Sequence, residues 1–244
     1  MRQEIFTITE NTPLTANVYR MRLAGDTSAI TAPGQFVNVK LDGLYLRRPI
    51  SVCDREGGTL TLIYKTVGKG TEQMARMRPG ETLDCLTGLG NGYDTAVSGQ
   101  RPLLLGGGVG VPPLYLLAKR LIAEGRRVSA VLGFNTRSEV FCVSEFRALG
   151  CAVTVTTADG SCGEKGFVTD ALPAGYTYFY ACGPEPMLKA VCRACGVSGQ
   201  LSFEERMGCG FGACMGCTIQ TKNGPRRVCK DGPVFRKEEL PWDA

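Results

Sequence analysis

The chain has 244 residues, 43% of them apolar, which allows either one large domain or about two to three smaller ones with a sizeable core. Its net charge of +5 is spread along the sequence, a distribution that favours an ordinary solvated surface over nucleic-acid binding. Histidine is absent, which excludes Ser-His-Asp and Cys-His catalysis and His-ligated metal sites. We therefore assign no side chain a catalytic role.

The hydropathy and the N-terminus argue against membrane insertion and secretion. No apolar run reaches the ~18–20 residues that a membrane span requires. Residues 1–10 include acidic side chains in an alternating pattern, unlike the positive and then apolar stretch of a signal peptide. We expect a cytoplasmic protein that does not bind membranes. In that compartment, 12 cysteines indicate metal or redox chemistry more than disulfides.

Residues 1–98 predict a first domain built from strands. Turns with Pro-Gly or Gly-Gly pairs separate short segments of alternating or apolar residues, and one short helical segment precedes the last strand. Strands at this spacing predict a small antiparallel barrel or sandwich. The expected strands are Glu4–Thr9, Leu14–Leu23, Gln35–Leu41, Leu46–Cys53, Thr59–Lys65 and Glu81–Leu86, and the expected helix is Thr71–Met77.

Residues 99–199 alternate between strand and helix patterns, which predicts an α/β domain with a parallel sheet. The chain from residue 200 to 244 is short, rich in Gly and Cys, and expected to be irregular. The fold class is thus multidomain: β-barrel, α/β domain and Cys-rich tail. The expected strands of the α/β domain are Pro102–Leu105, Val128–Gly133, Ala152–Thr156 and Tyr178–Ala181, and the helices are Pro112–Glu124, Ser144–Leu149 and Glu185–Cys195.

The tail carries the spacing Cys209-x4-Cys214-x2-Cys217-x11-Cys229. Its first three members match the plant-type ligand pattern of a two-iron, two-sulfur cluster, followed by a more distant fourth. Glycines among them give the backbone the freedom to approach the cluster sulfurs. The alternative is a structural zinc site, which the single C-x2-C pair disfavours. We expect most of the remaining cysteines to be small buried hydrophobic residues: Cys53, Cys85, Cys142, Cys151, Cys162, Cys182, Cys192 and Cys195.

Two segments of the α/β domain predict a nucleotide site. The first, Gly106-Gly107-Gly108-Val109-Gly110, lies between a strand and a helix, although Val111 replaces the third glycine of the dinucleotide fingerprint. A simple tight turn remains the alternative. The second, Cys182-Gly183-Pro184, also follows a strand and opens a helix, and parallel strands bring both segments to one sheet edge. No acidic residue ends the strand after the first segment, so NAD and NADP remain open, and Arg137 suits a 2′-phosphate.

Two segments of the first domain have side chains and amides that suit a ligand with a phosphate group. Arg48-Pro49-Ile50-Ser51 combines a cation with a hydroxyl, and Gly70-Thr71 opens a helix whose amides suit a phosphate. Either segment alone is more often a turn or an ordinary strand than a site.

Together these motifs resemble the ferredoxin–NADP reductase superfamily, which places a flavin barrel before a nucleotide domain. The resemblance implies that Arg48, Pro49, Ile50, Ser51, Gly70 and Thr71 bind FAD, with Ile63, Tyr64 and Lys65 lining its ribityl or adenine side. It also implies an NAD site at Gly106, Gly107, Gly108, Val109, Gly110, Cys182, Gly183 and Pro184. The domains would be residues 1–98 for FAD, 99–199 for NAD and 200–244 for the 2Fe-2S cluster.

The tail is similar to that of the electron-transfer subunits of bacterial NAD-dependent (type 1B) dihydroorotate dehydrogenases, in Glu204–Gly210, Gly212–Cys217 and Arg227–Phe235. That family implies a heterotetramer, two copies of each subunit, with an FMN-containing catalytic subunit that oxidises dihydroorotate to orotate in pyrimidine biosynthesis. Similar tails occur in subunits of NAD(P)H-dependent ferredoxin and sulfide oxidoreductases, which are the alternative. A flavin between nicotinamide and cluster fits the electron count, because it exchanges either two electrons or one.

Overall fold

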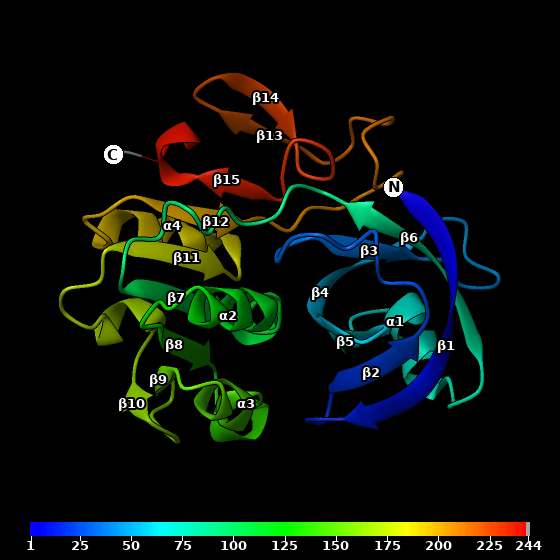
Figure 1. The fold of residues 1–244 in the computed structure, drawn as a ribbon, viewed down its shortest axis with the longest axis horizontal. Helices are drawn as coiled ribbons and strands as arrows, with labels where there is room; N and C mark the ends of the chain where they lie inside the picture. The colour runs from blue at the N-terminus through cyan, green and yellow to red at the C-terminus, as the bar shows by residue number, and fades with distance from the viewer. Residues whose placement is uncertain (243–244) are drawn as a thin grey trace.

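The structure is a computed structural model that describes residues 1–242. It contains a closed barrel at the N-terminus, a seven-stranded sheet and a two-stranded hairpin, and Figure 1 shows the barrel and the seven-stranded sheet side by side. The barrel order is β1-β2-β5-β4-β3-β6, all antiparallel. Its strands are β1 (Arg2–Pro13), β2 (Val18–Ala24), β3 (Phe36–Val39), β4 (Arg48–Glu56), β5 (Thr59–Lys65) and β6 (Thr82–Leu89), and α1 is Lys69–Arg76.

Alternating burial explains the barrel. In β6 every second residue is buried, and the interior is filled by apolar side chains such as Phe6, Met21 and Leu62, as period-2 alternation requires. The predicted barrel is confirmed. One strand start was wrong: β2 begins at Val18, because residues 14–17 form a turn in which the Thr15 hydroxyl accepts a hydrogen bond from Val18 N at 3.2 Å.

The seven-stranded sheet has the order β10-β9-β8-β7-β11-β12-β15. All neighbours are parallel except β12 and β15, so the predicted parallel α/β sheet is confirmed. Its strands are β7 (Pro102–Gly107), β8 (Ser129–Phe134), β9 (Ala152–Thr157), β10 (Glu164–Lys165), β11 (Tyr178–Cys182), β12 (Gly199–Ser202) and β15 (Val234–Arg236). The helices are α2 (Pro113–Ala123), α3 (Val143–Ala148) and α4 (Glu185–Ala194), with the short 3-10 turns η1 (Gly108–Gly110), η2 (Arg137–Glu139), η3 (Val168–Ala171) and η4 (Lys237–Glu239).

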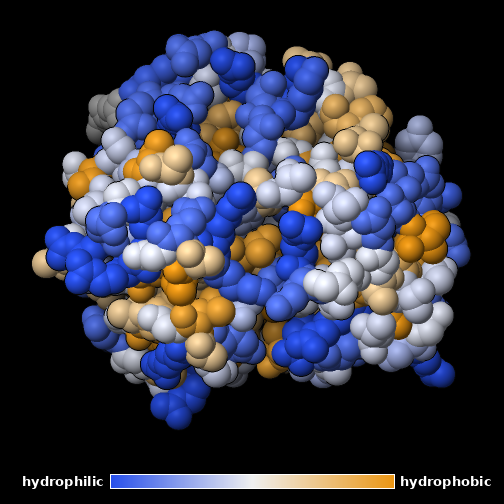
Figure 2. All heavy atoms as spheres, in the orientation of Figure 1, coloured by the Kyte–Doolittle hydropathy of each residue, from blue (hydrophilic) through white to orange (hydrophobic). Residues whose placement is uncertain are grey.

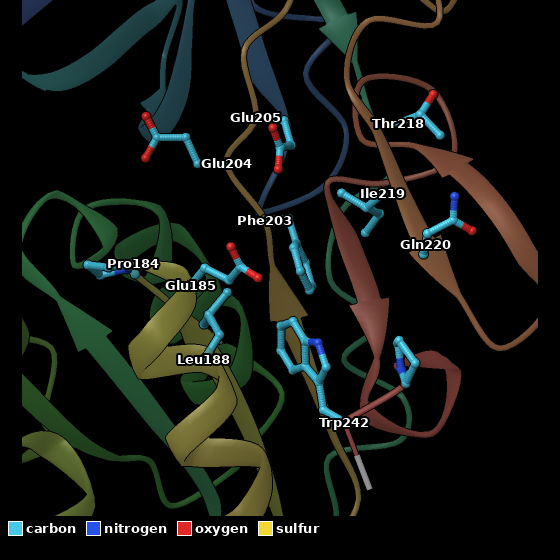
Figure 3. A pocket seen from close by; sticks show the side chains of 12 residues that line it. Pro184, Glu185, Leu188, Phe203, Glu204, Glu205, Thr218, Ile219, Gln220 and Trp242 are labelled. Atoms are coloured by element: carbon cyan, nitrogen blue, oxygen red, sulfur yellow. The ribbon is translucent and has the colours of Figure 1, made fainter. Parts of the chain in front are cut away.

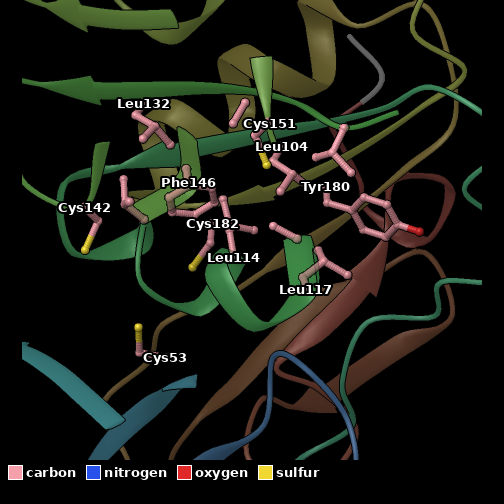
Figure 4. Close-up of a cluster of buried hydrophobic side chains, with 14 of the residues drawn as sticks. Cys53, Leu104, Leu114, Leu117, Leu132, Cys142, Phe146, Cys151, Tyr180 and Cys182 are labelled. Carbon is pink, nitrogen blue, oxygen red and sulfur yellow. The ribbon is translucent and has the colours of Figure 1, made fainter. Parts of the chain in front are cut away.

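Helices cover both faces of this sheet. Leu104 packs with α2 and α3 on one face, whereas Leu103 and Leu105 pack with α4 on the other, as alternation along a strand dictates. The first cluster continues into the barrel through Val18, Cys53 and Ile63, and Figure 4 shows Cys53 on the barrel side of it. The two domains therefore share a buried apolar contact.

The expected irregular tail contains more regular structure than the sequence predicted. β12 and β15 join the edge of the seven-stranded sheet, and β13 (Thr218–Thr221) pairs with β14 (Gly224–Arg227) as a hairpin. Short, partly polar strands give little periodic signal, which is why they escaped prediction. Most of the remaining cysteines are buried as expected, and only Cys162 among them is half-exposed.

The described part of the chain, residues 1–242, has no helix with the length and apolar character needed to cross a bilayer. On the face drawn in Figure 2, hydrophilic residues are interspersed with small apolar areas. Larger exposed apolar side chains occur at Tyr45, Val67 and Phe167, and also at Phe211 and Met215 in the tail.

Candidate functional site for a flavin, a nucleotide and an iron–sulfur cluster

The predicted flavin strand, Arg48–Ser51, forms the first part of β4 and is half-buried throughout. Arg48 lies against the start of α1, since a Cβ atom on Gly70 would collide with its Nε. The structure therefore brings Arg48 and Gly70-Thr71 together, as predicted, and puts a guanidinium beside a helix N-terminus, an arrangement that suits an anion. Arg47 has a different role, because its Nη1 donates to Asp84 Oδ1 at 2.9 Å and ties β4 to β6.

Strand β5 presents its three predicted residues in different directions. Ile63 belongs to the apolar cluster shared with the α/β domain, whereas Tyr64 packs inside the barrel and donates its hydroxyl to Asn11 Oδ1 at 3.0 Å. Lys65 lines a small cavity together with Gly108 and Val109. The barrel thus meets the first nucleotide loop at Lys65, while the Tyr64 side chain is turned away from it.

The two predicted nucleotide loops, Gly106–Gly110 and Cys182–Pro184, are in direct contact. Gly106 is paired with Cys182 between parallel strands β7 and β11, and a Cβ atom on Gly110 would collide with the Cys182 carbonyl. Gly108 has a φ of 53°, a conformation that glycine adopts readily. The second loop leads into α4, whose first-turn N–H groups have no intrahelical acceptor. Both loops lie at the carboxyl edge of the sheet, where nucleotides bind in such folds.

Arg137, which the sequence offered as a 2′-phosphate contact, is held by the loop after β9. Its Nε donates to the Ser161 carbonyl at 2.9 Å, and its backbone N donates to the Ser161 hydroxyl at 2.7 Å. The same hydroxyl donates to Asp159 Oδ1 at 2.6 Å, and this hydrogen bonding lowers the pKa of Asp159. Arg137 is therefore anchored to the loop after β9 through its Nε and its backbone N.

The predicted ligands Cys209, Cys214, Cys217 and Cys229 are brought together by the cluster loop, residues 208–217, and by the segment after β14. Sulfur atoms accept hydrogen bonds from backbone N–H groups: Cys209 Sγ from Ala213 at 3.2 Å, Cys214 Sγ from Cys209 at 3.4 Å, and Cys217 Sγ from Cys229 at 3.4 Å. Such amide donors stabilise thiolates and tune iron–sulfur clusters. Cys217 and Cys229 are buried, while Cys214 is exposed.

The surroundings of Cys209 and Cys229 shift the pKa values of these two thiols in opposite directions. Burial opposes ionisation of Cys209, but N–H groups of Phe211, Cys214 and Ala213 outweigh it and lower the pKa of Cys209 to about 6. Burial and the adjacent Cys217 thiol raise the pKa of Cys229 to about 12. Within residues 1–242, no group of three or more Cys, Asp or Glu side chains is arranged to hold a single metal ion; a two-iron cluster distributes its four thiolates over two irons. Four thiols, three of which accept backbone N–H hydrogen bonds, form a donor set that fits such a cluster.

Two residues that sequence reasoning missed hold the cluster loop in place. Asn38 Nδ2, from barrel strand β3, donates to the Cys209 carbonyl at 3.1 Å, and Arg227 Nη1 donates to the Gly212 carbonyl at 2.7 Å. The only signal for Asn38 was an amide between two valines in an apolar strand. Arg227 had no comparable signal for this contact, because its position depends on the β13–β14 hairpin.

A cavity of about 400 Å³ lies between the second nucleotide loop and β13. Figure 3 shows the Phe203 and Trp242 side chains in it, with ring centroids 5.3 Å apart. Glu185, Glu204 and Glu205 also line it. Three carboxylates disfavour a phosphate, so we do not place the pyrophosphate of a nucleotide there.

Comparisons with known proteins agree with this geometry. Residues 204–241 match the iron-sulfur cluster binding domain of dihydroorotate dehydrogenase B, and residues 104–193 match the oxidoreductase NAD-binding domain. The chain is 46% identical over 255 residues to a dihydroorotate dehydrogenase B (NAD(+)) electron transfer subunit from Geobacillus sp. (strain WCH70), covering 98% of this chain and 99% of the relative. A subunit of the same name from Fusobacterium nucleatum is 43% identical over 257 residues, with the same coverage.

Solved structures share the fold. A chain of an NADH-dependent reduced ferredoxin-NADP oxidoreductase, described in work on flavin-based electron bifurcation, superposes with a TM-score of 0.88 at 32% identity, over 98% of this chain and 90% of that chain. A ferredoxin NADP+ reductase from Neisseria gonorrhoeae with bound FAD and NADP has a TM-score of 0.69 at 17% identity, over 80% of this chain and 90% of that chain, which supports the fold alone. With relatives this similar over nearly its full length, the chain belongs to the family of dihydroorotate dehydrogenase B (NAD(+)) electron transfer subunits.

Proposed function

We propose that this chain passes electrons between an FMN-containing dihydroorotate dehydrogenase catalytic subunit and NAD+, with FAD and a 2Fe-2S cluster as its own cofactors. The reaction served is the oxidation of dihydroorotate to orotate in pyrimidine biosynthesis. The working assembly is a heterotetramer with two copies of each subunit. A cytoplasmic location belongs to the proposal, because a reducing compartment keeps the cluster cysteines available as thiolates.

The observation that carries the proposal is the position of the barrel between the nucleotide loops and the cysteines. Lys65 lines one cavity with Gly108 and Val109 of the first nucleotide loop. On another side, Asn38, whose strand pairs with the flavin strand, contacts Cys209. FAD, when bound, supplies the exchange of two electrons with a nicotinamide and of single electrons with a cluster. A flavin on this barrel therefore has access to both partners.

The residue roles follow from charge and position. Arg48 and Ser51 orient FAD, Gly70 and Thr71 hold its pyrophosphate at the start of α1, and Ile63, Tyr64 and Lys65 line its ribityl or adenine side, Tyr64 through its backbone. The two nucleotide loops hold NAD. The ligands of the cluster are Cys209, Cys214, Cys217 and Cys229.

We divide the chain into residues 1–98 for FAD, 99–199 for NAD and 200–244 for the cluster. The family matches at residues 104–193 and 204–241 support this division. The last segment nevertheless adds β12 and β15 to the sheet of the NAD-binding part, so the third unit is defined by the cysteines more than by a separate core.

The alternative, a subunit of an NAD(P)H-dependent ferredoxin or sulfide oxidoreductase, is not favoured. Curated relatives at 41–46% identity carry the dihydroorotate dehydrogenase B name, whereas the bifurcating enzyme's chain is 32% identical.

The direct test uses the native complex. The tagged chain is isolated anaerobically from its own cell, dihydroorotate and NAD+ are added, and NADH absorbance is followed. We expect NADH to form only when both substrates are present. A flavin-containing complex that NADH reduces but dihydroorotate does not would contradict the pathway and support the alternative.

A further inference from the structure

Asn38 lies where the flavin strand and the cluster loop meet. Strand β3 alternates: Val37 and Val39 face the barrel interior, whereas Phe36 packs into the apolar cluster that contains Cys217 and Cys229. Asn38, two residues after Phe36, shares this outer face. Its partner across the antiparallel pair is Pro49, and that of Phe36 is Ser51. Directly opposite residues project from the same face, so Asn38 stands beside Pro49 and Ser51 of the flavin strand.

The amide of Asn38 makes one specific contact, which is to a cluster ligand. Nδ2 donates to the Cys209 carbonyl at 3.1 Å. The next residue, Gly210, has a φ of 79°, and a Cβ atom at this position would collide with Asn38 Nδ2. Glycine therefore allows the close approach of the loop to the amide. The contact joins a flavin-side strand directly to the backbone of Cys209.

The burial of Asn38 is costly. The residue is 1% exposed, and Oδ1 is one of the few buried side-chain oxygens within residues 1–242 that have no hydrogen-bond partner. A buried acceptor without a donor destabilises a fold, and native proteins rarely keep one without a reason. Leucine has nearly the same shape and would avoid this cost. The retention of an amide therefore points to a role other than packing.

We propose that Asn38 is a positioning residue that fixes the cluster loop against the flavin strand and so sets the rate at which electrons pass between flavin and cluster. The inference rests on the proposed function. Electron transfer slows steeply as two centres move apart, and the Asn38 bond to Cys209 is the hydrogen bond that links β3 to the backbone of a cluster ligand. The same bond limits the loop movements that would alter the solvent exposure and the amide hydrogen bonds of the cluster.

The experiment compares the wild-type protein with Asn38→Leu in the native complex. Each complex is mixed anaerobically with NADH, and the reduction of the flavin and that of the cluster are followed separately. The reduced cluster is then examined by electron paramagnetic resonance. We expect flavin reduction by NADH to be unchanged and cluster reduction to slow by about tenfold, because the loss of a hydrogen bond of ordinary strength reduces the equilibrium constant for holding the loop in place by about that factor. We also expect a shifted cluster spectrum at an unchanged iron content.

Two further variants separate positioning from general stability. Gln200→Leu removes another buried amide, whose Nε2 donates to the Asp94 carbonyl at 3.0 Å, and it should leave cluster reduction and the spectrum as in wild type. Asn38→Ala also lacks the N–H donor, so it should behave like Asn38→Leu and replaces it if the latter does not fold.

The outcomes are distinct. Normal cluster reduction and an unchanged spectrum in Asn38→Leu would overturn the inference and leave the proposed function intact. Equal slowing in Gln200→Leu would also overturn it, because a general loss of stability would then explain the effect. A wild-type complex in which NADH reduces flavin but no cluster would overturn the proposed function and the inference together.

Discussion

The barrel interior and the cluster loop are stabilised in different ways. The barrel buries Phe6, Met21 and Leu60 completely, and burial of side chains of this size contributes ~1.5–3 kcal/mol each. In the cluster loop, Phe211 and Met215 are 45% and 52% exposed, and the order comes from hydrogen bonds to sulfur and carbonyl atoms. The comparison teaches that the barrel is ordered by its own apolar core. The order of the cluster loop depends instead on the bound cluster, because metal binding and local folding are coupled.

The strongest test of this contrast removes one ligand. In Cys217→Ser we expect electron transfer to the partner to fall by more than about 100-fold, the upper cost of losing even an outer-shell partner of a metal. FAD content and flavin reduction by NADH should stay normal, because the barrel does not depend on the cluster. Iron content and rapid mixing with NADH provide the measurement. A Cys217→Ser complex that reduces NAD+ at the normal rate would contradict the assigned electron path.

The second test truncates a side chain of the apolar core and leaves the cluster ligands unchanged. Leu105→Ala removes a fully buried side chain packed between the sheet and α4, and we expect the free energy of unfolding to fall by about 2–5 kcal/mol. Denaturant titration of the holoprotein measures the loss. The matched control Val97→Ala trims a side chain that is 41% exposed and should change the free energy by less than about 0.5 kcal/mol. Equal effects would show that burial does not control stability here.

The smallest effect concerns the link between the two large domains. Lys119 Nζ, on α2, lies 3.0 Å from Asp54 Oδ2 and 3.1 Å from Glu56 Oε2 of β4. The group is partly exposed, so we expect Lys119→Met to cost about 0.2–1 kcal/mol, as for other solvent-screened ion pairs. Lys189→Met, which breaks an ion pair within α4, is the control that leaves the domain contact intact.

The direction of the pKa shift of Lys119 determines how the stability difference between wild type and Lys119→Met changes with pH. Burial opposes the charge on Lys119, but hydrogen bonds to Asp54 and Glu56 outweigh it and raise the pKa of Lys119 above the ordinary 10.5. A raised pKa in the folded state means that the stabilisation is fully present below the unfolded value and is lost as pH rises through the folded value. Unfolding of wild type and Lys119→Met should therefore differ at neutral pH and converge above the folded pKa. A difference that persisted there would assign the effect to packing of the lysine stem.

Much of the fold could be predicted, because the periodic spacing of apolar residues indicates most of the helices and strands. Thr59–Lys65 has the bounds expected for β5, and the pattern of strands alternating with helices predicted the parallel sheet. The tail strands could not be predicted in the same way, because β13 and β14 have only four residues each and their pairing depends on the hairpin turn. The turn before Val18 was missed for a similar reason, since apolar Leu14 resembles the start of a strand.

The candidate site was predictable where chemistry is local. Cysteine spacing predicted which thiols the fold brings together, and the glycine-rich turns predicted two loops that meet at the carboxyl edge of the sheet. Asn38 was not predictable, because its significance comes from Gly210 and Cys209, which approach it only in the folded chain. The hydrogen bonds between Arg137 and Ser161 were not predictable for the same reason, since the two residues are 24 positions apart in the sequence.

The pairing of β15 with β12 has a consequence for assembly. Both strands lie at one edge of the sheet, with Leu201 opposite Phe235, so the whole segment between them is tethered at its two ends. Because its two ends are held together, this segment has less conformational entropy than a free chain, even before iron and sulfide bind. The pairing itself uses none of the four cysteines, so the sheet can be completed before the cofactor is inserted.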